Sequence, residues 1–275
     1  MTTPLTPHPT GRRALVTGCS SGIGRATALE LAGRGYEVTA TARRPETLAG
    51  LPVARTLALD VDDDASVAAA RAAVGPIDVL VNNAGFGIEG AVEEVPLDDV
   101  RRAFETNVFG PARMIQAFLP DMRQQRSGAI VNVTSVAGIA APPLAGFYAA
   151  TKFALEALSE ALAFEVGHFG VRVVIVEPGG IATEFGANMV DHRDRPGPYV
   201  DLARQWAGAT ETLRGGQAAP GPETVATAIA EALEADQAPL RLPVGTDAEL
   251  VAATRAALPF DEFQAAMRQV LGIEW

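Results

Sequence analysis

Short runs of apolar, often β-branched residues alternate along the chain with longer stretches in which apolar residues recur every three or four positions. The short runs predict strands, at residues 14–17, 37–42, 55–59, 79–82, 129–134, 172–177 and 240–244. The longer stretches predict amphipathic helices, at residues 23–32, 65–74, 97–122, 147–166 and 223–233. Because helices separate most successive strands, the pattern predicts a doubly wound, Rossmann-type α/β fold with a parallel seven-stranded sheet.

The chain shows no internal repeat or linker, so we expect a single domain over residues 12–275. Residues 1–11 predict a flexible tail, because they lack the apolar core of a signal peptide. Residues 181–220 are polar and loop-rich and predict a partly helical lid over a site. Residues 246–275 predict a helical extension with a cap at Asp261. Its apolar residues repeat at helical spacing: Phe263, Met267, Val270 and Leu271.

Composition narrows the class of protein. Of 275 residues, 48% are hydrophobic and 20% charged, which excludes disorder, collagen and coiled coil as the main architecture. The formal charge of -11 disfavours nucleic acid and anionic membranes as partners. No apolar run reaches the roughly 20 residues of a membrane span. Cys19 is the only cysteine and the three histidines lack ligand spacing, so we expect a cytoplasmic protein without disulfide or metal site.

The basic residues are almost all arginine, and Lys152 is the single lysine. A compact ammonium and a planar guanidinium differ chemically, so the exception indicates a function at this position. Tyr148 precedes Lys152 by four residues, which places both side chains on one face of the predicted helix. A nearby ammonium stabilises a phenolate, and we expect it to lower the pKa of Tyr148 toward the range useful for proton transfer. With only three tyrosines in the chain, a chance pairing would be rare.

The first predicted strand leads into a glycine-rich turn, with the sequence TGCSSGIG at residues 17–24, and then into a helix. Glycines allow the backbone to approach a pyrophosphate closely, and the free N–H groups of a helix N-terminus bind its charge. The turn therefore predicts a phosphate cradle of a dinucleotide site. The spacing differs from that of the usual Rossmann fingerprint, and a purely structural turn is the alternative.

The second predicted strand ends in Ala42, Arg43 and Arg44. NAD sites commonly place an acidic residue here to bind the ribose hydroxyls, and this chain has none. Two guanidiniums instead favour the 2′-phosphate of NADP. The alternative is a solvated arginine pair at a strand end.

The fifth predicted strand ends at Ser135. Doubly wound sheets bind ligands at the carboxyl ends of their strands, so this hydroxyl is a candidate donor to a substrate carbonyl. A serine in this position is more often a turn or cap residue, and that alternative stays open.

Together these residues resemble the short-chain dehydrogenase/reductase family over about residues 11–245. The resemblance rests on ordered motifs: TGCSSGIG, Asp60 after the third strand, NNAG at 82–85, Asn107, Ser135, YAATK at 148–152 and PGGIAT at 178–183. It implies that Tyr148 is the catalytic acid and base and that Lys152 binds the nicotinamide ribose. It further implies that Ser135 orients the reacting oxygen and that Asn107 holds a relay water.

The resemblance also implies an NADP(H) site. It would place Asp60 near the adenine, the NNAG segment beside the adenosine ribose and Thr183 against the nicotinamide carboxamide. The full set of residues expected to bind the cofactor is Gly18, Ser20, Ser21, Gly22, Ile23, Gly24, Arg43, Arg44, Asp60, Val61, Asn83, Ala84, Gly85, Thr134, Tyr148, Lys152, Pro178, Gly179, Ile181 and Thr183.

The wider pattern, with ATARRP, NNAGFG and PVG, is similar to the hydroxysteroid- and retinol-dehydrogenase-like branch of that family. The positions that the resemblance places around the substrate are nearly all apolar, with Glu184 and His192 as nearby exceptions. They are Phe86, Ile88, Ala137, Ile139, Pro142, Phe185 and Met189. We therefore expect a small carbonyl or alcohol substrate that is mainly apolar.

The helices predicted at 97–122 and 147–166 carry apolar residues on more than one face, whereas the sheet can cover only one. This predicts a homodimer or homotetramer through these helices, as the family resemblance also implies.

The sequence thus predicts an NADP(H)-dependent oxidoreductase that moves a hydride between nicotinamide and a ketone or secondary alcohol. One alternative is an enzyme of the same fold with a net non-redox outcome. The other is a regulator that binds NADP without turnover, although it would have little need of the Ser135, Tyr148 and Lys152 set.

Overall fold

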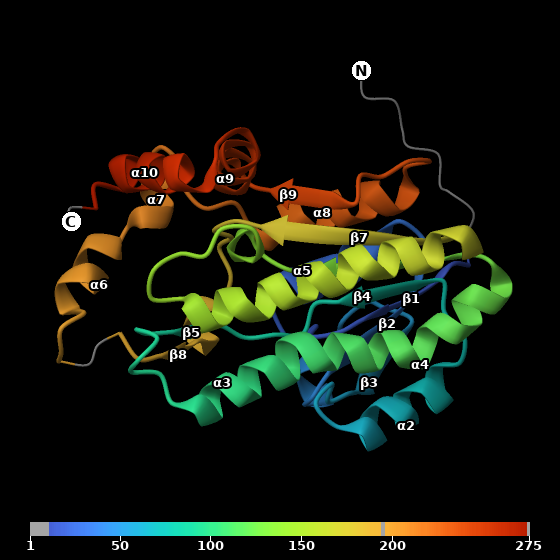
Figure 1. Ribbon diagram of the computed structural model, residues 1–275. Helices are drawn as coiled ribbons and strands as arrows, with labels where there is room; N and C mark the ends of the chain where they lie inside the picture. Colours follow the sequence, from blue (N-terminus) through green and yellow to red (C-terminus); the bar gives the residue numbers. More distant parts are fainter. Residues whose placement is uncertain (1–10, 194–195, 274–275) are drawn as a thin grey trace.

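The computed structural model describes residues 11–193 and 196–273, and within these residues seven parallel strands form one central sheet (Figure 1). The strand order is β3-β2-β1-β4-β6-β7-β9, which confirms the predicted doubly wound topology. The strands are β1 (Arg13–Val16), β2 (Glu37–Ala42), β3 (Arg55–Ala58), β4 (Val79–Asn82), β6 (Gly128–Val133), β7 (Val171–Pro178) and β9 (Arg241–Val244). The order reverses between β1 and β4, where sheets of this kind bind ligands. The predicted tail lies outside the described residues, apart from Gly11.

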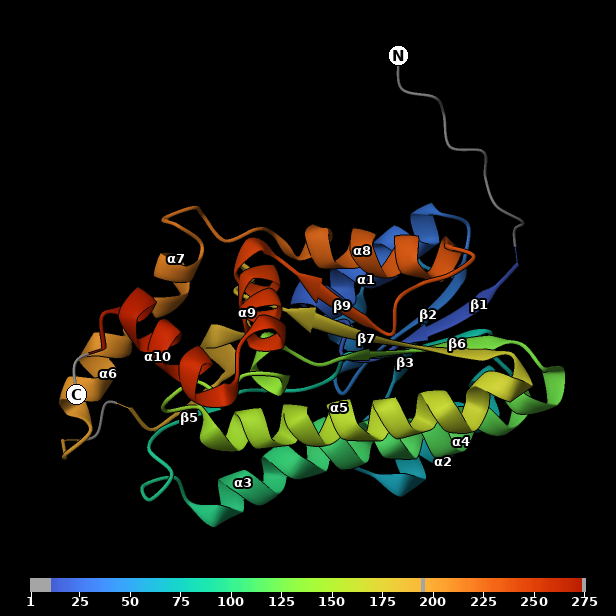
Figure 2. The same cartoon turned by 45° about the horizontal axis from the view of Figure 1, so that its top comes forward.

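Helices cover both faces of the sheet (Figure 2). One face packs against α1 (Gly22–Gly33) and α8 (Pro222–Glu234), and the other against α2 (Asp64–Val74), α4 (Gly110–Gln125) and α5 (Gly146–Val166). Successive residues of a strand point to opposite faces, so both must be apolar. In β1, Val16 joins the first core and Leu15 the second. Each fully buried side chain of this size contributes about 1.5–3 kcal/mol.

The helix predicted at 97–122 is interrupted. It consists of α3 (Leu97–Phe104), a π-helical turn (Glu105–Phe109) and α4. Pro111 has no N–H to donate to the carbonyl of Asn107 four residues earlier. The N–H of Gly110 donates to the carbonyl of Glu105, five residues earlier. Asn107 therefore lies where the α-helical ladder is interrupted.

The lid and the C-terminal extension lie together beyond the carboxyl ends of the strands (Figure 2). In the lid, β8 (Val190–Asp191) pairs with β5 (Ile88–Glu89), and α6 (Val200–Trp206) and α7 (Ala209–Leu213) follow. The extension is helical, as predicted, and forms α9 (Thr246–Ala257) and α10 (Phe260–Leu271). Pro259 separates them, so α10 begins at Phe260 and the predicted cap Asp261 lies in its first turn.

Four short 3-10 turns complete the elements of residues 11–193 and 196–273. They are Pro45–Leu48, Val136–Gly138, Gly167–Phe169 and Gly186–Asn188. The turn after β6 places Ser135 as its N-cap, with the hydroxyl oxygen accepting from the N–H of Ala137 at 3.1 Å. Ser135 thus has the capping role left open above and also borders the site.

Candidate functional site

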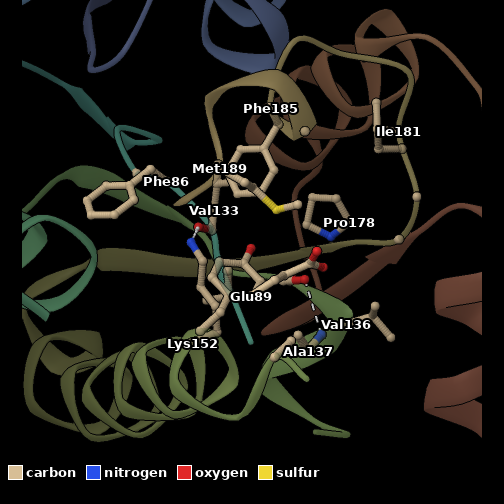
Figure 3. Close-up of a pocket in the computed structure, with 18 of the residues that line it drawn as sticks. Phe86, Glu89, Val133, Val136, Ala137, Lys152, Pro178, Ile181, Phe185 and Met189 are labelled. Carbon is tan, nitrogen blue, oxygen red and sulfur yellow. Dashed lines mark hydrogen bonds between the residues drawn. The ribbon is translucent and has the colours of Figure 1, made fainter. Parts of the chain in front are cut away.

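A cavity of about 1390 Å³ lies where the carboxyl ends of the strands meet the lid and α10. Sites for a single small molecule usually measure about 300–1,000 Å³, so this cavity has room for two ligands side by side. Its wall includes every residue that the sequence predicted for the cofactor and substrate except Gly24 and Ile88. Figure 3 shows part of this wall, with Phe86, Phe185 and Met189 around the space that Lys152 also borders.

The glycine-rich turn has the backbone that a phosphate cradle requires. Gly18 and Gly22 have φ of 72° and 56°, a region that favours glycine. A Cβ on Gly18 would lie 2.8 Å from the Cα of Ala84, so the turn fits only without a side chain. Ser21 begins α1 without a side-chain cap, which leaves the first amides of the helix for a ligand. These residues fit a dinucleotide pyrophosphate.

Gly24 has a different role from the one predicted. It does not line the cavity, and a Cβ there would overlap the amide nitrogen of Asn83 and the carbonyl of Gly18. The glycine therefore lets α1 pack closely against the segment that follows β4, as the third glycine of a nucleotide fingerprint does.

Thr17 joins the glycine turn to the NNAG segment, a connection that the sequence did not reveal. Its hydroxyl oxygen accepts from the N–H groups of Asn83 and Ala84, at 2.9 and 3.0 Å, and donates to the carbonyl of Val81. The side-chain amide of Asn83 donates back to the carbonyl of Thr17 at 2.9 Å. Two loops that border the cofactor end of the cavity are thus held as one unit. The sequence feature that could have pointed to this connection is the Thr-Gly pair that opens the turn.

The adenosine end of the cavity is bordered by Arg43, Arg44, Asp60 and Val61. Within the described residues neither guanidinium of the arginine pair forms an ion pair. Asp60 Oδ1 accepts from the N–H of Asp62, which fixes the turn after β3. Two cations without an ion-pair partner suit an anionic group such as a 2′-phosphate.

Ser135, Tyr148 and Lys152 come together on one side of the cavity. Tyr148 and Lys152 lie on the first two turns of α5, and the Nζ of Lys152 is 5.7 Å from the centre of the tyrosine ring. Nζ donates to the carbonyl of Val133 at 3.0 Å, which ties the lysine to the end of β6. The Ser135 hydroxyl is close enough to Tyr148 to favour the phenolate and thus to lower the pKa of Tyr148.

The expected lowering of the tyrosine pKa is absent. Burial raises the pKa of Tyr148 to about 12, against the opposing hydrogen bond from Ser135, and the negative charge of Glu89 raises it further. Burial also lowers the pKa of Lys152 to about 8, despite the nearby carboxylate of Glu156. For both groups, desolvation by burial is the largest cause of the pKa shift. The sequence could give their spacing but not their solvation.

Behind Lys152, α5 carries a buried carboxylate, Glu156, one turn further along. Its Oε1 accepts from the hydroxyl of Thr134 at 2.6 Å, and its Oε2 from Nε of Arg241 at 3.1 Å. Burial raises the pKa of Glu156, whereas these partners and Lys152 lower it. Glu156 was not among the predicted site residues, although it follows Lys152 at the same four-residue spacing as Lys152 follows Tyr148.

Asn107 braces the site rather than lining it. Its amide nitrogen donates to the carbonyl of Phe86 and to the hydroxyl of Thr151, and its Oδ1 accepts from the N–H of Phe86. The side chain is therefore engaged with the protein, and it holds the NNAG loop against α5. The main-chain carbonyl of Asn107 lacks its α-helical donor, because Pro111 has no N–H.

The part of the cavity that was predicted to hold the substrate is lined mainly by apolar side chains, and Glu89 and Glu184 also border it. The residues that line it as expected are Phe86, Ala137, Ile139, Pro142, Phe185 and Met189. Ile88 does not: it is 1% exposed and packs with Val95, Val100 and Ala103. Because β5 pairs with β8, alternate residues point away from the cavity, and Glu89 borders the cavity instead.

The lid and α10 add a wall that the sequence did not assign to the substrate. Its apolar residues are Trp206, Leu213, Phe260, Phe263, Met267 and Leu271. Of the four residues at helical spacing in the extension, Phe263, Met267 and Leu271 border the cavity, whereas Val270 is exposed. Glu89 forms an ion pair with Arg193 of the lid at 2.6 Å.

Two absences are findings about the described part of the chain. Across residues 11–193 and 196–273, no group of three His, Cys, Asp or Glu side chains is arranged to hold a metal ion. Over the same residues, no helix has the length and apolar character needed to span a bilayer.

Known proteins resemble the chain over most of its length. The model of a family described as short chain dehydrogenase matches residues 12–194. A 3-ketodihydrosphingosine reductase of Bacteroides thetaiotaomicron is 36% identical over 260 residues, which cover 92% of this chain and 96% of the relative. The 17-beta-hydroxysteroid dehydrogenase type 1 of Homo sapiens is 38% identical over 249 residues, covering 82% and 75%. The resemblance seen in the motifs is confirmed.

Solved structures with this fold hold either nicotinamide cofactor. A short chain dehydrogenase from Burkholderia cenocepacia in complex with NADP has a TM-score of 0.76 at 28% identity, over 95% of this chain and 98% of that one. A short chain dehydrogenase/reductase from Burkholderia phymatum in complex with NAD has a TM-score of 0.72 at 28% identity, over 94% and 95%. The choice of cofactor must therefore be argued from the residues at the adenosine end.

Proposed function

Because the chain belongs to the short-chain dehydrogenase family, we propose that it is an NADP(H)-dependent oxidoreductase that interconverts a ketone and a secondary alcohol. The observation that carries this proposal is the meeting of Ser135, Tyr148 and Lys152 on one cavity wall, in the same cavity as the glycine cradle. The cradle suits a pyrophosphate and the hydroxyl pair suits a carbonyl oxygen, so one cavity can hold both reactants.

In the direction of reduction, NADPH held by the glycine cradle would supply the hydride for the carbonyl carbon. The carbonyl oxygen then gains negative charge, and the hydroxyls of Ser135 and Tyr148 stabilise it by hydrogen bonding. Tyr148 donates its proton to that oxygen, which completes the alcohol. Oxidation of the alcohol uses the same groups in reverse. A tyrosine with a raised pKa is protonated at neutral pH, which suits the acid role in reduction.

Lys152 supports this chemistry from a fixed position. Its hydrogen bond to the carbonyl of Val133 holds the ammonium beside the tyrosine ring. A cation there stabilises the phenolate that forms when the proton leaves, even though burial dominates the resting pKa of Tyr148. Ser135 keeps its own geometry through the 3-10 turn that it caps.

NADP is proposed over NAD because of charge. Arg43 and Arg44 border the cavity at the end of β2, where the adenosine ribose would bind, and Ala42 stands where NAD sites place an acid. The proposed substrate is a mainly apolar carbonyl or alcohol, because aromatic and aliphatic side chains of the lid and α10 surround the substrate end.

The test is an NADPH-oxidation screen over ketones, aldehydes and quinones of graded size. We expect turnover with apolar ketones, and turnover lowered by about 10²- to 10⁴-fold in the Tyr148→Phe variant. Activity confined to phosphorylated or carboxylate substrates would contradict the proposed pocket. Product formation without net NADPH consumption would favour a non-redox enzyme, and NADPH binding without any turnover would favour a regulator.

A further inference from the structure

Asp247, the second residue of α9, is a buried carboxylate at the edge of the cavity. It is 2% exposed. Its Oδ2 accepts from the N–H of Gly180 at 2.7 Å and its Oδ1 from the N–H of Ala248 at 3.0 Å. A carboxylate buried this deeply is costly unless such donors satisfy it, and the first turn of a helix also favours negative charge.

Glycine backbones shape the space around this carboxylate. A Cβ on Gly179 would lie within 2.7 Å of both carboxylate oxygens, and these with Cγ are its three nearest neighbours. A Cβ on Gly245 would lie 2.9 Å from Oδ1. The φ of Gly179 is not in the left-handed region, so the carboxylate itself excludes a side chain there. The turn after β7 and the carboxylate are therefore mutually fitted.

The same turn leads to the part of the chain that frames the cavity. The N–H of Gly179 donates to the carbonyl of Val244, and the N–H of Ala182 donates to the carbonyl of Pro220. Thr183 follows and lies against Gly22 of the phosphate cradle, where a Cβ would be 3.4 Å away. Asp247 thus holds one end of a short segment whose other end borders the cofactor site.

The carboxylate also faces the lid. Nη1 of Arg214, which follows α7, lies 3.9 Å from Oδ2, and both side chains are largely buried. Both residues lie beyond residue 194, where the match to the family model ends. The structure therefore places a charged contact between the lid, the C-terminal extension and the cofactor side of the site.

We propose that Asp247 is a positioning residue that holds the Gly179–Gly180 turn in its cofactor-binding shape and couples it to the lid through Arg214. The inference rests on the proposed function, because it assigns the turn to the nicotinamide end of the bound cofactor. Asp247 acts through the backbone that it orients and through Arg214, and it takes no part in proton or hydride transfer.

The first experiment compares NADPH dissociation constants of the wild-type protein and Asp247→Asn. The amide keeps the shape but loses the charge that strengthens the bond to Gly180, so we expect binding weakened about tenfold or more. Backbone hydrogen exchange in residues 178–186 should become faster. Glu249→Gln, an exposed change on the same helix, is the matched control and should alter neither quantity. Unchanged binding and exchange in a folded Asp247→Asn protein would overturn the proposal.

A double-mutant cycle separates positioning from general destabilisation. Gly179→Ala should weaken NADPH binding in the wild type, because the added Cβ displaces the carboxylate. In the Asp247→Ala background the same change should cost far less, since the obstructing atoms are gone. Additive effects of the two substitutions would show that the Asp247 carboxylate does not restrict the space at Gly179. Gly179→Ala alone, which leaves Asp247 unchanged, keeps the proposal testable if Asp247→Asn does not fold.

Arg214→Met tests the coupling to the lid. It should raise KM for the best carbonyl substrate of the screen more than it raises the NADPH dissociation constant. An equal change in both would contradict the coupling. A wild-type protein that binds no NADPH would instead refute the proposed function, so the two failures are distinguishable.

Discussion

Lys152 donates its Nζ hydrogen bond to the carbonyl of Val133 at 3.0 Å, so the only lysine of the chain is anchored to a strand of the sheet. Tyr148 lies on the same helix face but is 5.7 Å away, measured from Nζ to the ring centre. The pair therefore has its relative position fixed by the junction of α5 with β6, and the predictions below depend on that junction.

Tyr148→Phe should lower kcat by about 10²- to 10⁴-fold, the usual contribution of a positioned acid–base group. NADPH affinity should remain close to that of the wild type, because only the hydroxyl is removed. Steady-state kinetics and a binding titration measure both. Tyr199→Phe is the matched control, since that exposed hydroxyl donates to Glu93 away from the cavity wall. Wild-type turnover in Tyr148→Phe would disprove the role of Tyr148.

Lys152→Arg should also be damaging, although it preserves the charge. Lys152 is 5% exposed and its ammonium donates to the carbonyl of Val133, a contact that a larger planar guanidinium does not repeat with the same geometry. We expect a loss in kcat/KM of at least about tenfold, as expected for a charged hydrogen bond. An unchanged kcat/KM in Lys152→Arg would show that the position needs only positive charge.

The depressed pKa of Lys152 predicts a pH-dependent stability. Its pKa falls from 10.5 to about 8 in the folded protein, so between these values the unfolded chain binds more protons and stability rises with pH. Below pH 8 the folded protein bears the cost of a buried charge. Lys152→Met should therefore increase the free energy of unfolding at pH 7, and this gain should shrink by pH 10. Urea unfolding at both pH values tests it; an equal difference at both would contradict the shift.

Cofactor choice should follow the arginine pair. One charge-assisted contact contributes about 1.5–3 kcal/mol, so NADPH should bind roughly tenfold to a hundredfold tighter than NADH. The double substitution Ala42→Asp with Arg43→Leu should erase or reverse this preference, because a carboxylate repels the phosphate and accepts from a free hydroxyl. Dissociation constants for both cofactors decide it. Equal affinities in the wild type would refute the NADP assignment and leave the oxidoreductase assignment standing.

Helix α5 and the π-helical turn before α4, where Phe109 is 52% exposed, present large apolar side chains that the sheet does not cover. Phe153, Leu158 and Phe164 of α5 are 43%, 45% and 82% exposed. We expect a homodimer or homotetramer through this face, as measured by light scattering at micromolar concentration. Leu158→Glu should lower the mass, whereas Leu250→Glu, an equally exposed leucine on α9, should not. A monomeric wild type would contradict the prediction.

The amino-acid sequence determined those features that depend on near neighbours along the chain. The parallel sheet followed from the alternation of strands and helices, and the glycine cradle from the residues of one turn. The shared face of Tyr148 and Lys152 followed from helical spacing alone. Each of these needs only local geometry and the rule that parallel strands present their carboxyl ends at one edge.

Tertiary structure decided what depends on contacts between distant segments. The pKa of Tyr148 is set by burial and by Glu89, and the partners of Asn107 come from Phe86 and Thr151. Ile88 turns away from the cavity only because β5 pairs with β8, which begins about 100 residues later. Asp247 contacts Gly180 because β7 pairs with β9, and the two residues follow these strands. The solvation of side chains, the pairing of strands and the hydrogen bonding of buried polar groups are properties of the packed chain, and no local pattern encodes them.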